Sequence, residues 1–98
     1  MIDGYLLRYF LAIVETGSFT AAAARVNVTQ PTLSAGVAKL ERELGVPLFV
    51  RSARRVELTE AGARFLQRAR NIMQEYNAAL GEIGEPARRR ALRLGLLH

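Results

Sequence analysis

The order of elements in this chain is decided by residues 18–62, which read SFTAAAARVNVTQPTLSAGVAKLERELGVPLFVRSARRVELTEAG. Ser18 and Thr29 each stand just before a stretch of helix-forming residues. A hydroxyl at that position can accept a hydrogen bond from a free N–H group of the first turn. Asn27 lies between the two stretches, where it should end the first helix. The stretch therefore predicts two consecutive helices joined by a short turn.

The second of these helices, expected over residues 29–44, should have one buried and one exposed face. Its apolar residues recur at intervals of three or four, which places them toward the core: Leu33, Val37, Leu40 and Leu44. The opposite face carries Gln30, Thr32, Ser34, Ala35 and Lys39. Gly36 in mid-helix is expected to cost roughly 1 kcal/mol relative to alanine, and Gly45 should end the helix.

A basic hairpin is expected to follow. Two apolar runs, residues 48–51 and 55–58, flank a tip near residues 52–54, and Thr59 is placed to cap the next helix. A helix with a polar N-terminal end beside a basic hairpin suits a DNA duplex. The helix can enter the major groove while the hairpin reaches the backbone or the adjacent minor groove.

Two more helices complete the expected architecture. The first has Asp3 as its N-cap, Gly17 at its end, and one apolar face that contains Leu6, Leu7, Phe10, Leu11 and Val14. The other begins at residue 60 and carries a coiled-coil-like apolar seam. Residues predicted for dimerisation are Phe65, Ala69, Ile72, Met73, Tyr76, Leu80 and Ile83. Packing of the seam on its own domain is the alternative.

The long helix is expected to be weakened by Gly81 and Gly84 and ended by Pro86. Residues 88–98 alternate basic and apolar side chains and then become apolar, as in a hinge that leads into the first strand of another domain. One strand without a partner cannot form a sheet. We therefore expect this chain to be the N-terminal part of a longer protein.

Composition and charge narrow the class of protein. The 98 residues suffice for one domain with a modest core, and half of them are apolar. Net charge is +5, and Lys39 is the only lysine among 14 cationic residues. This balance favours an anionic partner such as nucleic acid, although an organism that favours arginine would also produce part of it. The sequence has no cysteine, no membrane-length apolar run and no signal peptide, which fits a cytoplasmic protein.

Four motifs resemble the LysR-type transcriptional regulators. They are Ser18-Phe19-Thr20-x-Ala22-Ala23, Thr29-Gln30-Pro31-x-x-Ser34, Leu40-Glu41-x-x-Leu44-Gly45-x-x-Leu48-Phe49-x-Arg51 and Leu58-Thr59-x-Ala61-Gly62. The resemblance runs from about residue 5 to about residue 97. It implies a mainly α fold, a winged helix-turn-helix of three helices and a two-stranded β wing, followed by a long dimerisation helix.

The resemblance also implies a domain organisation and partners. Residues 1–59 would form the DNA-binding domain, residues 60–85 the linker or dimerisation helix, and residues 86–98 a hinge and the start of an effector-binding domain outside this chain. Such regulators assemble as dimers or tetramers on interrupted palindromes of double-stranded DNA, and a small-molecule effector switches them. The family often has an arginine after the serine of the recognition helix, but Ala35 and Gly36 stand here. A contact made there by an arginine is therefore absent.

Eleven residues are predicted to contact DNA: Ser18, Thr29, Gln30, Pro31, Thr32, Ser34, Ala35, Lys39, Arg51, Arg54 and Arg55. Gln30 is the strongest base reader, because its amide offers both a donor and an acceptor; a solvated side chain is the alternative. Ser34 could instead bond its own helix. Arg51 could pair with Glu41, Glu43 or Glu57, whereas Arg54 stands at the hairpin tip. Ser18 and Thr29 are helix caps first, and either could also hold a phosphate.

Other classes of function find little support in the sequence. The only histidine is terminal, and the chain has neither a cysteine nor a glycine-rich phosphate loop, so no enzyme, metal or cofactor is expected. A module that binds only proteins through the long helix leaves Gln30, Ser34 and the arginine hairpin unexplained. RNA remains open on charge alone, but the hairpin lacks the aromatic platform expected for single strands.

Overall fold

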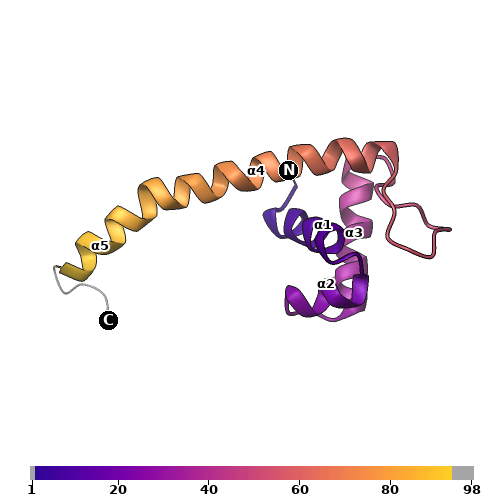
Figure 1. Ribbon diagram of the computed structural model, residues 1–98, viewed down its shortest axis with the longest axis horizontal. Helices are drawn as coiled ribbons and strands as arrows, with labels where there is room; N and C mark the ends of the chain where they lie inside the picture. The colour runs from indigo at the N-terminus through magenta and orange to yellow at the C-terminus, as the bar shows by residue number, and fades with distance from the viewer. Residues whose placement is uncertain (1, 94–98) are drawn as a thin grey trace.

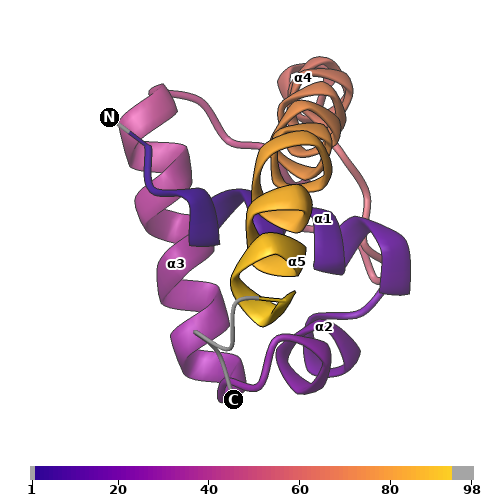
Figure 2. The ribbon, with the colours of Figure 1, turned by 90° about the vertical axis from the view of Figure 1, so that its left-hand side faces the viewer.

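The computed structural model describes residues 2–93. These residues form a mainly helical fold with one short antiparallel pairing in the segment that joins the third and fourth helices (Figure 1). The elements in order are α1 (Gly4–Thr16), α2 (Phe19–Arg25), α3 (Gln30–Leu44), α4 (Glu60–Ala79), the π-helical turn η1 (Leu80–Gly84) and α5 (Glu85–Arg93). Helix α1 packs against α2, α3 and the first part of α4. Figure 1 shows that α4, η1 and α5 form an arm that extends beyond this cluster, and Figure 2 views the arm from its far end.

Side-chain hydroxyls fix the starts of three helices, as the sequence predicted. Ser18 accepts a hydrogen bond from the backbone N–H of Ala21 at 3.1 Å. Thr29 accepts one from the N–H of Thr32 at 3.2 Å, and the Thr59 hydroxyl accepts from Gly62 in the same way. The starts of α2, α3 and α4 are therefore set by local sequence.

The prediction that Asp3 caps α1 with its side chain is wrong. Asp3 occupies the N-cap position, but its carboxylate makes no capping hydrogen bond. It lies 3.5 Å from Nζ of Lys39 on α3 instead. A nearby cation thus draws the carboxylate away from the helix, a competition that the local sequence does not reveal. Gly17 does end α1, in the left-handed conformation expected of it.

The core gathers around Phe10 of α1, which has no exposed surface. Its ring centroid lies 5.5 Å from that of Phe49, at the base of the wing, and 5.1 Å from that of Phe65 on α4. The other large and fully buried side chains are Leu6, Ile13, Leu33, Val37, Leu40 and Leu48. One aromatic side chain therefore joins the three-helix cluster, the wing and the long helix.

Helix packing explains the glycine at position 36, which the sequence alone did not explain. It is buried where α3 crosses α1, and a Cβ atom there would lie 2.7 Å from the ring of Tyr9. Glycine has an unfavourable helix propensity, but here it permits a close approach of α3 to α1 that a larger residue would obstruct. One face of α3 is therefore packed closely against α1.

The wing (residues 48–58) pairs less extensively than the two short strands expected. Its only antiparallel bridge among the described residues joins Phe49 to Leu58, flanked by hydrogen bonds from Val50 N–H to Glu57 and from Thr59 N–H to Leu48. The N–H of Leu48, which a longer ladder would use, donates to the carboxylate of Glu41 at 2.6 Å. That competing acceptor limits the pairing at the base of the wing.

The long helix does not end at Pro86, contrary to the prediction. The π-helical turn η1 contains Gly81 and Gly84, and α5 then continues to Arg93. Pro86 is the second residue of α5, a position in the first turn where proline is tolerated. Residues 88–93 are thus helical rather than the approach to a strand. The rest of the predicted strand, residues 94–98, lies outside the described residues, and no helix within 2–93 is long and apolar enough to cross a membrane.

Candidate nucleic-acid interface

The first two turns of α3 present an exposed polar surface. Its buried side packs Leu33 and Val37 into the core. The exposed side chains are Gln30, Pro31, Thr32, Ser34 and Ala35, and Thr29 before the helix is exposed as well. The structure therefore brings together six of the predicted DNA-contact residues at one end of one helix. We call these six residues the reading end of α3.

Two side-chain hydrogen bonds order the reading end. The hydroxyl of Thr29 donates to Oγ1 of Thr32 at 2.9 Å, in addition to its capping role. The hydroxyl of Thr20, from α2, donates to Oε1 of Gln30 at 3.1 Å. Sequence reasoning did not single out Thr20, because the contact joins two helices and ten residues separate the partners. Within the described part of the chain, Ser34 makes no bond back to its own helix.

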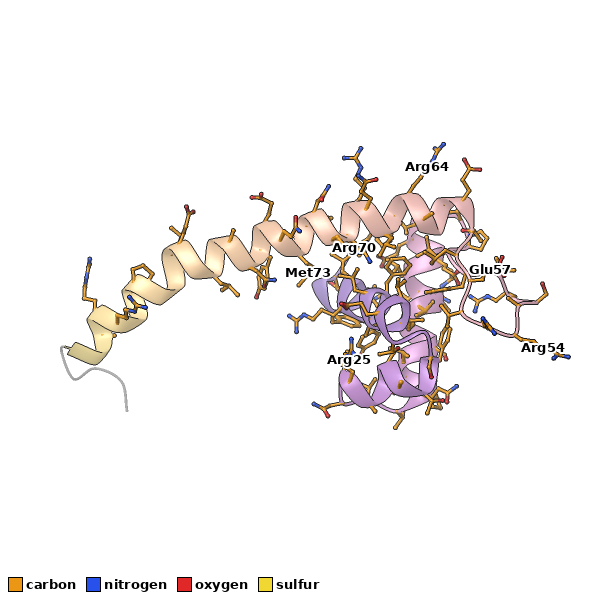
Figure 3. All side chains as sticks on the ribbon, viewed as in Figure 1. Arg25, Arg54, Glu57, Arg64, Arg70 and Met73 are labelled. Atoms are coloured by element: carbon orange, nitrogen blue, oxygen red, sulfur yellow. The ribbon has the colours of Figure 1, made fainter. Side chains whose placement is uncertain are left out.

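The arginines of the wing differ in how they are held. Arg51 forms an ion pair with Glu41, the first of the structural alternatives raised for it, although its side chain remains 64% exposed. Arg54 and Arg55 are exposed. Figure 3 shows Arg54 at the far end of the wing, pointing away from the helices. Arg54 is therefore the wing residue best placed to reach a partner beyond the domain.

Glu41 fastens the base of the wing to α3. Its side chain is only 10% exposed. One carboxylate oxygen accepts from the N–H groups of Leu48 and Phe49, at 2.6 and 3.3 Å, and the other meets Arg51. A buried carboxylate is tolerated where donors surround it in this way. Glu41 thus helps to set the position of the wing relative to the reading end. From the sequence, it was considered only as a possible ion-pair partner of Arg51.

An open groove of about 320 Å³ separates the wing from the start of α2. Ser18 and Phe19 line one side, and Arg51, Arg54 and Arg55 are among the residues on the other. Ser18 thus faces the wing arginines across this groove rather than joining the reading end directly. The groove gathers three arginines and one carboxylate, Glu57, between the wing and α2.

Lys39 does not lie with the reading end. It is nine residues after Gln30, which corresponds to roughly 13 Å along a helix. Its ammonium pairs with Asp3. Electrostatic interaction with the side chain of Tyr5, and then with the carboxylate of Asp3, raises the pKa of Lys39 above its usual value. These contacts connect α3 to the N-terminal segment through Lys39.

The apolar seam of the long helix divides in two. Ala69 has no exposed surface within a single chain, so its prediction as a dimerisation residue is wrong. Phe65 is half-buried against Phe10, and Met73 is half-buried on the side of α4 that faces α1. The exposed fractions of the remaining seam residues are 49% for Ile72 and for Tyr76, 52% for Leu80 and 72% for Ile83. We call these four residues the outer stripe.

Comparisons with known proteins agree with this architecture. The family model described as "Bacterial regulatory helix-turn-helix protein, lysR family" matches residues 5–63. The chain is 43% identical over 94 residues to the HTH-type transcriptional regulator XapR of Escherichia coli (strain K12), an alignment that covers 96% of this chain and 32% of XapR. The chain spans about a third of the length of the curated relatives that it first matches.

Solved structures of protein–DNA complexes share the fold. The BenM_DBD/benA site 1 DNA complex matches with a TM-score of 0.82 and 36% identity, covering 87% of this chain and 96% of that one. The CbnR_DBD–DNA complex matches with a TM-score of 0.75 and 39% identity, covering 91% of this chain and 98% of that one. The matched family model covers more than half of the sequence. The chain therefore belongs to the lysR family of bacterial regulatory helix-turn-helix proteins.

Proposed function

We propose that this chain binds double-stranded DNA in a sequence-specific manner, as the DNA-binding part of a transcriptional regulator. The reading end of α3 enters the major groove, and the wing approaches the backbone or the adjacent minor groove. The observation that carries the proposal is the reading end itself, a cluster of exposed and mostly polar side chains on a helix whose other face is buried in the core. Its likeness to BenM_DBD and CbnR_DBD, which were solved on DNA, supports the same assignment.

We assign the following roles to individual residues, with their positions as support. Gln30 reads a base edge, while Pro31 and Ala35 offer apolar contact to a thymine methyl group. Thr32 and Ser34 donate to bases or phosphates. Arg54 and Arg55 contact phosphates or a minor groove, and Arg51 adds charge while it holds the wing. The chain acts by binding rather than by catalysis, and its site of action is the bacterial cytoplasm, where the DNA lies.

A second copy of the chain is the proposed partner of the outer stripe. A single reading end spans only a few base pairs, too few to define one site in a genome. Two copies joined through α4 double the number of bases read and fix the spacing of two half-sites. The DNA site is then an interrupted palindrome. In the whole protein, a small-molecule effector would act through a domain outside this chain.

The proposal is tested by letting the chain select its own DNA. A duplex library with a randomised central segment is enriched on the 98-residue chain, and the selected duplex is compared with a scrambled duplex of the same composition. Gln30→Ala should lower affinity for the selected duplex by roughly 1–3 kcal/mol and leave the scrambled duplex nearly unaffected.

Gln74→Ala supplies the matched control, because Gln74 is an exposed glutamine on α4, away from the reading end. It should change neither affinity. Failure of the wild-type chain to enrich any sequence would contradict the proposal. Equal losses on both duplexes for Gln30→Ala would remove Gln30 from base reading.

A further inference from the structure

We infer that Thr20 is a positioning residue for Gln30. Its hydroxyl fixes the orientation of the Gln30 side-chain amide and so sharpens the base preference of α3. The inference rests on the proposed DNA-binding function, which it deepens by naming a residue outside the recognition helix that shapes specificity. The juxtaposition that carries it is the 3.1 Å hydrogen bond from Thr20 Oγ1 to Gln30 Oε1.

The two residues meet where two fixed helix starts lie close together. Thr20 is the second residue of α2 and Gln30 is the first residue of α3. Figures 1 and 2 both show α2 beside the first turn of α3. Ser18 caps the first helix and Thr29 caps the second, so both backbones are held before any ligand arrives. The hydrogen bond therefore joins two side chains whose main-chain attachments are already set.

The chemistry of glutamine makes such a bond informative. Rotation of the amide by 180° exchanges a carbonyl acceptor for an NH₂ group with two donors. A base edge in the major groove is recognised by its order of donors and acceptors, so the two orientations read different bases. A freely rotating Gln30 would present both patterns and discriminate poorly between them.

The structure favours one of these orientations. In this structure the Thr20 hydroxyl donates to Oε1 of Gln30. Oε1 keeps a second lone pair, and no acceptor among residues 2–93 engages the Nε2 group. The donors of Gln30 thus remain available to DNA in a defined direction. Ordering of the side chain before binding reduces the entropy lost on recognition.

The test uses the duplex that the wild-type chain selects, together with duplexes in which each half-site position is replaced by the other three base pairs. Thr20→Val removes the hydroxyl and keeps the shape of the side chain, while Thr20→Ser keeps the hydroxyl. Both are measured in the native background and with Gln30→Ala. The position read by Gln30 is the one whose discrimination disappears in Gln30→Ala.

At that position Thr20→Val should reduce discrimination between base pairs by about three- to tenfold, because the amide regains its freedom to rotate. Thr20→Ser should retain discrimination within about twofold, since its hydroxyl still donates. Affinity for scrambled DNA should not change. In the Gln30→Ala background, Thr20→Val should have no further effect. Both residues are exposed, so the midpoint of thermal unfolding should stay constant in all variants.

Three results would overturn the inference. An equal loss on every duplex, including in the Gln30→Ala background, would make Thr20 a direct phosphate contact. Unchanged discrimination in Thr20→Val would make its hydroxyl a solvated group. A wild-type chain that selects no sequence would overturn the proposed function itself, and the inference with it, so the two failures are distinguishable.

Discussion

The two halves of the long helix carry the same kind of apolar seam and use it differently. In the first half, Ala69 is fully buried and Phe65 packs on Phe10 of α1. In the second half, Ile72 and Tyr76 are each 49% exposed. The periodicity is the same, so the difference comes from length. Helix α1 has 13 residues and α4 has 20, roughly 20 and 30 Å at 1.5 Å per residue, and η1 and α5 extend the arm further.

The lesson is that an apolar seam identifies a surface to be buried but not what buries it. The first turns of α4 bury their seam inside the chain because α1 lies beneath them. The outer stripe has no such neighbour among residues 2–93. Substitutions at the buried seam residues of the first half should therefore act on folding, and those in the outer stripe on assembly.

The largest effect is expected from Ala69→Asp. The substitution places a charge in a fully buried position without a partner, which should lower the free energy of unfolding by at least about 3 kcal/mol. Ala78→Asp, at an exposed position of the same helix, should change it by less than about 0.5 kcal/mol. Urea denaturation followed by circular dichroism measures both. Equal stability of the two variants would show that α4 is not anchored on α1.

Glu41→Ala should have the next largest effect. Loss of the carboxylate leaves the N–H groups of Leu48 and Phe49 without their acceptor. The free energy of unfolding should fall by about 2–3 kcal/mol. Glu43→Ala, on an exposed side of the same helix, is the matched control and should be nearly neutral. If both variants unfold at the same urea concentration, Glu41 does not hold the wing.

Ile72→Asp tests the outer stripe. It should leave the free energy of unfolding almost unchanged but weaken binding to a full palindromic duplex by about tenfold or more, because a charge would be buried between two copies. Affinity for a half-site should change by less than about twofold, since the reading end is untouched. Ala78→Asp, off the stripe, again serves as the control. Parallel losses on full and half-site duplexes would place Ile72 outside the interface between copies.

The smallest effect is expected at the wing tip. Arg54→Ala should lower affinity only modestly and reduce the slope of log K against log salt concentration by about 0.9 for each phosphate that Arg54 neutralises. If Arg54 lies in a minor groove, the loss of affinity should be larger on A·T-rich flanks, where that groove is narrow. Arg64→Ala is the matched control, because Arg64 pairs with Glu60 on the side of α4 opposite the helix cluster (Figure 3). An unchanged slope on every duplex would put Arg54 in solvent.

Local features of the fold could be predicted because local chemistry determines them. The hydroxyl caps at Ser18, Thr29 and Thr59 and the glycine that ends α3 act within one turn of chain. The exposed face of α3 followed from periodicity alone. Features that depend on distant neighbours could not be foreseen: the ion pair that diverts Asp3, the close approach of Tyr9 to Gly36, and the continuation of the helix past Pro86.

The candidate site divides in the same way. Gln30 could be selected from the sequence, because its residue type and its place at a helix start are both local. Two contacts could not be predicted in this way: the hydrogen bond from Thr20 to Gln30 and the hydrogen bonds that Glu41 accepts from the wing. Each joins two elements whose separation is set by tertiary packing. Ala69 was misassigned for the same reason: a seam does not show which of its residues the chain itself covers.

The central claim is that the outer stripe joins two copies so that two reading ends meet one duplex. Sedimentation equilibrium of the wild-type chain, alone and with the palindromic duplex that it selects, tests this most directly. We predict a dimer in free solution at high concentration and two chains on each duplex, with Ile72→Asp monomeric in solution. A wild-type chain that is monomeric at every concentration and binds the palindrome as a single copy would contradict the claim.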